Sequence, residues 1–104
     1  MRFLPVCAFL ALSAVQAFGA AAADGKAVFD MKCKSCHAAD GSGNPAIAKM
    51  MKVTMRPLGS ADVQAQSDAA LTAIIDNGKG KMPKQTVTPA QAKDLIAFIR
   101  TLKK

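Results

Sequence analysis

The segment Cys33-Lys34-Ser35-Cys36-His37 places two thiols and an imidazole within five consecutive residues. Two cysteines three positions apart lie on the same side of one helical turn, so both sulfurs can reach one flat group. The next residue, His37, is then held beside that group, and it is the only histidine in the chain. A site built on this segment uses all three side chains together.

This C-x-x-C-H spacing is the attachment signature of c-type haem. The two thiols form thioethers with the porphyrin, and the histidine offers a nitrogen to the iron. A zinc site would need about four ligands, and only the carboxylates of Asp30 and Asp40 lie nearby. A thioredoxin-like redox pair would need a βαβ context, which the sequence lacks. We therefore predict that Cys33 and Cys36 attach one haem c and that His37 is an axial iron ligand.

Residues 1–23 have the pattern of a secretory signal peptide. Met1-Arg2 provides a short positive start, an apolar run covers residues 3–18, and residues 19–23 are all small. The apolar run is short for a membrane span, which needs about 20 apolar residues. We expect cleavage between residues 19 and 24, removal of Cys7 with the leader, and export to the periplasm without a membrane anchor.

Residues 24–104 form one small domain with few large apolar side chains, among them two aromatic ones, Phe29 and Phe98. A domain of this size buries too little apolar surface to offset chain entropy easily, unless a disulfide, metal or cofactor staples it. A disulfide between Cys33 and Cys36 would close a very short loop and stabilise little. A bound haem would supply the missing core.

The apolar periodicity of this domain is helical throughout, which predicts an all-α fold. We expect helices over residues 24–36 and 46–51, a helix that begins after an N-cap at Ser67 and ends near residue 77, and a last helix that begins at a capping box of Thr88 and Gln91. The apolar face of the last helix comprises Ala92, Leu95, Ile96, Ile99 and Leu102. Residues 40–45 and 78–83 are rich in glycine and proline and predict loops.

The second axial ligand is predicted to be Met82. Its thioether is a soft ligand that suits haem iron, and it lies in a Gly/Lys/Pro loop with no helical face to fill. The other methionines of the domain are more simply explained as flexible core residues. Met55, or an open iron position, is the alternative to Met82.

The domain resembles the small class I c-type cytochromes. The resemblance rests on Cys33-x-x-Cys36-His37, on Gly78-Lys-Gly-Lys-Met82-Pro83 some 45 residues later, and on the closing amphipathic helix. It implies a cytochrome c fold of about four helices around one haem, with only an edge of the ring exposed.

The resemblance also implies contacts around the haem. In the family, terminal helices cross where a glycine lets the backbones approach, and Gly25 and Phe29 would meet Leu95 and Phe98 there. A proline loop usually accepts a hydrogen bond from the proximal histidine, which points to Pro45. Arg56 is our candidate donor to a haem propionate.

With His37 and Met82 on the iron, no position is left for a substrate, and the expected function is one-electron transfer rather than catalysis. The chain carries 14 Lys and Arg against seven Asp, a net charge of +7. Lys79, Lys81 and Lys84 flank Met82 and could steer acidic redox partners to a monomeric carrier. Too few aromatic residues are present for nucleic-acid stacking. A haem enzyme or gas-binding protein with a labile Met ligand, or a fixed subunit of a larger redox complex, are the alternatives.

Overall fold

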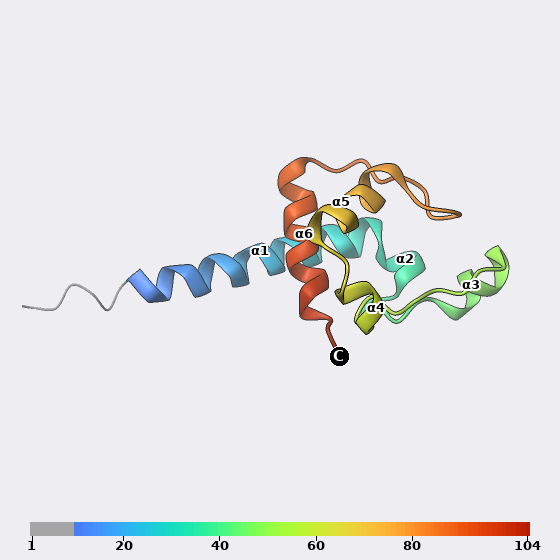
Figure 1. Cartoon of the computed structure of the whole chain (residues 1–104), viewed down its shortest axis with the longest axis horizontal. Helices are drawn as coiled ribbons and strands as arrows, with labels where there is room; N and C mark the ends of the chain where they lie inside the picture. Colours follow the sequence, from blue (N-terminus) through green and yellow to red (C-terminus); the bar gives the residue numbers. More distant parts are fainter. Residues whose placement is uncertain (1–9) are drawn as a thin grey trace, which may run out of the picture.

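The computed structural model describes residues 10–104, and their side chains from Gly19 onward. Within that part of the chain every regular element is a helix, apart from one isolated bridge between Lys79 and Met82. The all-α prediction is confirmed. The helices, labelled in Figure 1, are α1 (Leu10–Lys32), α2 (Lys34–His37), α3 (Pro45–Met51), α4 (Ala61–Gln64), α5 (Asp68–Asn77) and α6 (Pro89–Thr101).

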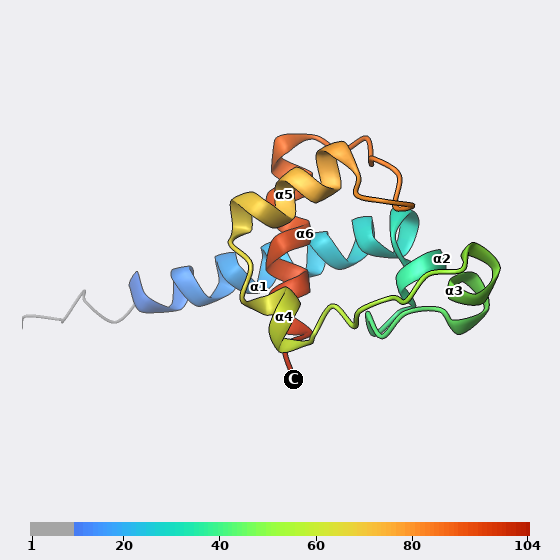
Figure 2. The same ribbon diagram turned by 45° about the vertical axis from the view of Figure 1, so that its right-hand side comes forward.

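The fold is organised by the crossing of α1 and α6, which both views of the ribbon show (Figures 1 and 2). Gly25 lies at the crossing, where a Cβ built on it would lie 1.9 Å from the main-chain oxygen of Asp94. Any side chain there would force the helices apart. Beside it, the rings of Phe29 and Phe98 pack at a centroid distance of 5.0 Å and an interplanar angle of 52°. The predicted contact of Gly25 and Phe29 with the last helix is confirmed.

The core continues from this crossing into α4 and α5. Phe29 and Leu95 are its most buried large side chains, at 0% and 1% exposure. The buried cluster comprises Val28, Phe29, Val63, Leu71, Ile75, Leu95, Ile96 and Phe98, with Leu102 only partly buried at its edge. The apolar face predicted for the last helix is thus the face that α6 turns inward.

Arg100 joins α6 to the turn between α4 and α5. Its guanidinium donates to the main-chain oxygens of Gln64 and Gln66, at 2.9 and 2.7 Å, and to the carboxylate of Asp68 at 2.7 Å. The Gln64 side chain donates in turn to the main-chain oxygen of Ile99 at 3.0 Å. These bonds fix the position of α5 relative to α6.

The helix ends carry the predicted caps. The Ser67 hydroxyl accepts from the Ala70 N–H at 3.1 Å, and Thr88 and Gln91 form both bonds of a capping box. Local side-chain chemistry therefore determines where α5 and α6 begin.

The first helix differs from the prediction of residues 24–36. α1 is already helical at Leu10, the first described residue, because the alanine-rich stretch before Asp24 is a strong helix former. It ends at Lys32, so that Cys33 separates it from α2. The N-terminal part of α1 extends away from the other helices (Figure 1). Residues 1–9 of the predicted leader, with Cys7, lie outside the described residues. Among those that are described, no helix is long and apolar enough to cross a membrane.

Two further differences concern short elements. The sequence did not indicate α4, which has only four residues and is too short to show a period. The resemblance implied about four helices, and α2 and α4 are single turns added to four longer ones. Residues 53–59 form neither helix nor strand.

Candidate haem site

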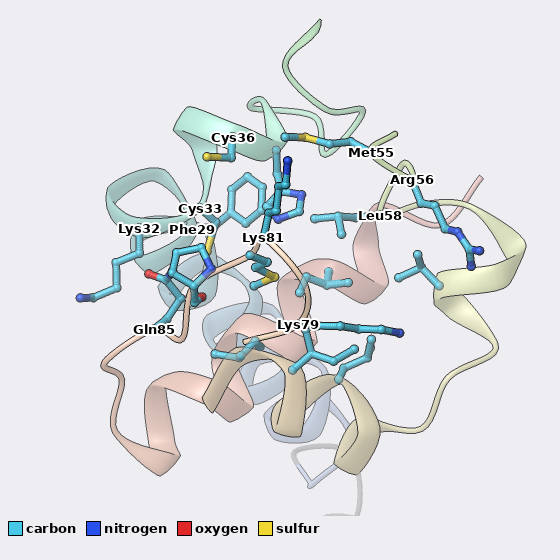
Figure 3. A pocket seen from close by; sticks show the side chains of 18 of the residues that line it. Phe29, Lys32, Cys33, Cys36, Met55, Arg56, Leu58, Lys79, Lys81 and Gln85 are labelled. Carbon is cyan, nitrogen blue, oxygen red and sulfur yellow. The ribbon is translucent and has the colours of Figure 1, made fainter. Parts of the chain in front are cut away.

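A cavity of about 620 Å³ opens between the C-terminal end of α1, α2, α5, α6 and the loop that carries Met82. Five of the six predicted site residues line it: Cys33, Cys36, His37, Arg56 and Met82. Figure 3 shows both thiols on one side of this cavity and Arg56 on the opposite side. Most of the remaining wall is apolar and includes Phe29, Met51, Val53, Met55, Leu58, Leu71, Ile74, Ile75, Leu95 and Ile99.

The two cysteines are held by the single turn of α2. The N–H groups of Cys36 and His37 both donate to the carbonyl of Cys33, at 3.2 and 2.9 Å. Both thiols are half-buried and free. Burial raises the pKa of the Cys33 thiol. Two free thiols on one turn at a cavity wall are the arrangement that covalent attachment of a flat group requires.

His37 presents a buried polar atom to this site. Burial lowers the pKa of its imidazole, so the ring is neutral at neutral pH and can act as a ligand. Its Nδ1 atom is buried and makes no hydrogen bond among the described residues. A buried nitrogen without a hydrogen bond lowers the stability of a folded chain unless a further group binds it. The His37 ring thus suits a site completed by another group.

The loop after α2 anchors the backbone of the motif rather than the imidazole. The Gly43 N–H donates to the His37 carbonyl and the Asn44 N–H to the Cys36 carbonyl, both at 2.8 Å. Pro45 is exposed at the start of α3 and does not line the cavity. The expected hydrogen bond from His37 to a carbonyl of the Pro45 loop is absent among the described residues, since the Nδ1 atom has no partner there.

Ala38 joins His37 to this loop in an unusual conformation. Its φ of 64° and ψ of 161° fall in a region that only glycine adopts without strain. Its N–H continues the helix by donating to Lys34 at 2.9 Å. The turn that positions His37 therefore carries backbone strain.

Met82 lies in a tight turn across the cavity. The main chains of Lys79 and Met82 exchange two hydrogen bonds of 3.0 Å, and Gly78 and Gly80 have φ values of 77° and 58° that favour glycine. The Met82 side chain is half-buried at the cavity wall.

Met55 lies on the other side, against the loop that follows His37. A Cβ built on Gly43 would lie 3.1 Å from the Cβ of Met55 and 3.7 Å from its sulfur. Because Gly43 is itself bonded to the His37 carbonyl, Met55 belongs to the same wall as the motif.

Charged groups gather at the rim. Arg56 is exposed, and its nearest partner is the equally exposed Asp62 at 3.9 Å, an interaction of little strength. Lys79 and Lys81 line the mouth, whereas Lys84 is exposed outside the lining. In Figure 3 Lys79 points to one side of the cavity and Lys32 away on the other side.

Several wall residues were not predicted. Val53, Thr54 and Leu58 enter the wall from the irregular segment after α3. Pro57 and Gly59 interrupt this segment, and it has no periodicity from which a buried face could be inferred.

The site residues fit a covalently bound haem. The cavity volume lies within the range of about 300–1,000 Å³ typical of cofactor sites. Two free thiols, a neutral histidine with an unpaired buried nitrogen and a thioether all line it. The fold and the site together define a c-type cytochrome.

The comparisons with known proteins agree. The sequence model of the family Cytochrome c matches residues 22–103. The structure is similar to that of the KustC0563 c-type cytochrome, with a TM-score of 0.66 and 28% sequence identity, covering 78% of this chain and 99% of that one. No curated protein sequence matches the chain. The chain belongs to the cytochrome c family, and it is a haem-binding electron-transfer protein with covalently attached c-type haem.

Proposed function

We propose that this cytochrome is an exported, monomeric one-electron carrier with a single haem, whose iron is held by His37 and Met82. One observation carries the proposal: the two thiols, the imidazole and the Met82 thioether, from segments some 45 residues apart, all line one largely apolar cavity. With both axial positions taken, the protein would transfer electrons without binding a substrate at the iron.

Each residue of the site has a defined task. Cys33 and Cys36 attach the haem, which supplies a one-electron change between ferric and ferrous iron. His37, kept neutral by burial, offers a nitrogen. Met82 offers a thioether, which favours the reduced state and raises the reduction potential. The apolar wall excludes water from these ligands and lowers the local dielectric.

Arg56 is our candidate for a propionate contact. It lines the cavity, and its guanidinium has only the weak, exposed pairing with Asp62 to compete with a haem carboxylate. A guanidinium can donate two parallel hydrogen bonds to one carboxylate, which suits a propionate at the rim of the cavity.

The exposed lysines beside Met82 support a docking role. Lys79 and Lys84 have no hydrogen bond or ion pair from their ammonium groups among the described residues, so both remain available to a partner. Acidic redox partners would be steered toward this edge of the haem, at a rate that falls with rising ionic strength.

Export follows from the leader pattern of residues 1–23. Cleavage between residues 19 and 24 would remove the part of α1 that extends away from the other helices (Figure 1) and leave the crossing at Gly25 intact. A periplasmic location also matches a c-type site, because haem attachment of this kind takes place outside the cytoplasm.

The ligand assignment is tested by two matched methionine variants. Met82→Ala is expected to lose the weak far-red absorption band of Met–Fe(III) and to lower the reduction potential. Met55→Ala removes the same side chain from the opposite wall and is expected to keep the band. Loss of the band in Met55→Ala, or its survival in Met82→Ala, would contradict the assignment.

A further inference from the structure

The loop that carries Met82 is anchored firmly at its base. The Gly78 N–H donates to the Ile74 carbonyl and the Gln85 N–H to the Ile75 carbonyl, both at 2.8 Å. These bonds join both ends of the loop to α5. The tip of the loop, the turn of residues 79–82, extends beyond α5 toward the cavity mouth, so its position depends on contacts made at the tip itself.

The opposite side of the mouth is formed by the C-terminal end of α3. The N–H groups of Lys52 and Val53 bond back to carbonyls of Lys49 and Ala48, and no main-chain donor reaches the carbonyl of Met51 among the described hydrogen bonds. Met51 is the last residue of α3, so its carbonyl is one of the unpaired acceptors at the negative end of a helix.

Lys81 joins these two sides. Its ammonium group donates to the Met51 carbonyl at 2.5 Å, across 30 positions of sequence. Within residues 10–104 this is the only hydrogen bond between the segment 45–56 and the loop 78–85. Figure 3 shows Lys81 over the middle of the cavity, unlike Lys79. A hydrogen bond from a charged donor is stronger than one between neutral groups.

We propose that Lys81 is a positioning residue: its bond to the Met51 carbonyl closes the Met82 loop over the cavity and holds the Met82 thioether on the iron. The proposal rests on the proposed His37 and Met82 ligation. It separates Lys81 from Lys79 and Lys84, which keep the docking role, because an ammonium bonded to a helix end is not free for a partner. Loss of the bond lets the turn swing outward and exposes the iron to small ligands.

The test uses the exported holo-protein without any redox partner, so that docking contributes nothing. Lys81→Met keeps the chain length and removes the donor, and Lys79→Met removes the same charge from the same turn as the control. Two properties are measured in the ferric protein: the rate of cyanide binding, and the temperature at which the far-red band disappears relative to loss of helix signal in circular dichroism.

Lys81→Met is expected to bind cyanide about tenfold faster, as loss of one charged hydrogen bond implies, and to lose the band well before the helices melt. Lys79→Met is expected to behave as the unchanged protein, and Lys81→Arg, which keeps a charged donor, to recover most of the difference. Equal effects in Lys81→Met and Lys79→Met would show a charge effect and overturn the inference. Absence of the far-red band from the unchanged protein would instead overturn the ligation on which the inference rests.

Discussion

The α1–α6 crossing and the cavity mouth are built in opposite ways. At the crossing, Gly25 brings two backbones into contact, and Phe29 is fully buried against Phe98. At the mouth, Met82 on one side and Met51 on the other are only half-buried, and among the described residues a single hydrogen bond, from Lys81, joins the two sides. The chain completes its own packing at the crossing but leaves the mouth to be completed by the haem.

The largest effect on stability is expected from introducing a side chain at the α1–α6 crossing. Gly25→Val would place carbon atoms inside the Asp94 main chain, and overpacking of this kind should cost about 3 kcal/mol or more, or prevent folding. The measurement is the free energy of unfolding in guanidinium. Ala27→Val, at an exposed position of the same helix, is the control and should cost about 0.5 kcal/mol. Equal effects of the two variants would mean that the helices do not depend on close approach at Gly25.

The next largest effect is expected at Arg100, whose guanidinium joins α6 to the turn between α4 and α5. Arg100→Met leaves the carbonyls of Gln64 and Gln66 without their charged donor, and it should lower the free energy of unfolding by about 2 kcal/mol. The far-red band should persist until the protein unfolds, because Arg100 does not line the cavity. Lys26→Met, which breaks only an exposed pair on α1, should have a much smaller effect. An Arg100→Met protein as stable as Lys26→Met would contradict this role.

A smaller effect, of opposite sign, is expected beside the cavity. Ala38→Gly relieves a conformation that costs a side-chain-bearing residue about 1–3 kcal/mol, partly offset by the greater freedom of glycine when unfolded. We expect a gain of about 1 kcal/mol in the free energy of unfolding. Ala39→Gly, at the next position, which is exposed, should be neutral or destabilising. A loss of stability in Ala38→Gly would show that the turn after His37 is not strained.

The smallest effect concerns the loop between α2 and α3. The Ser42 hydroxyl and N–H donate to the Asp40 carboxylate, at 2.6 and 3.0 Å, and hold the pKa of that carboxyl below its ordinary value. Because the folded pKa is lowered, the carboxylate stabilises the fold above the ordinary pKa of aspartate, and this contribution is lost as pH falls through the folded pKa. Ser42→Ala should raise the pKa of Asp40 toward its ordinary value.

The titration is followed by NMR of the carboxyl carbons. The carboxyl of Asp30, whose pKa is lowered mainly by its hydrogen bond from Lys26, serves as the internal reference and should not change. An unchanged pKa of Asp40 in Ser42→Ala would mean that the hydroxyl is not the main cause of its shift.

Features that depend on neighbouring residues could be predicted from the sequence. The caps of α5 and α6 were predictable because Ser67 and Thr88 act on N–H groups three positions away. The grouping of Cys33, Cys36 and His37 at one site could be predicted because one helical turn brings the three side chains together. Met82 was predicted as the second axial ligand because a methionine in a glycine-rich loop has no helix face to fill, and its side chain does line the cavity with the motif.

Several hydrogen bonds between distant segments could not be predicted. Arg100 donates to main-chain carbonyls more than 30 positions away. Every residue type carries the same main-chain carbonyl, so the sequence does not indicate which of them accept. The hydrogen bond expected from His37 to the Pro45 loop is absent among the described residues, because tertiary contacts decide which way a loop's carbonyls face. The bond from Lys81 to the Met51 carbonyl was missed for the same reason.

The central claim, an iron closed on both sides by this chain's own residues, is tested most directly by one spectrum. The absorption of the exported holo-protein is recorded in the ferric form, in the ferrous form, and again after carbon monoxide is added to the ferrous form. The account predicts a low-spin ferric spectrum with the far-red band and a ferrous spectrum that carbon monoxide does not change. A high-spin ferric spectrum, or an immediate shift with carbon monoxide, would show an open iron and contradict the electron-carrier function in favour of an enzyme or gas-binding protein.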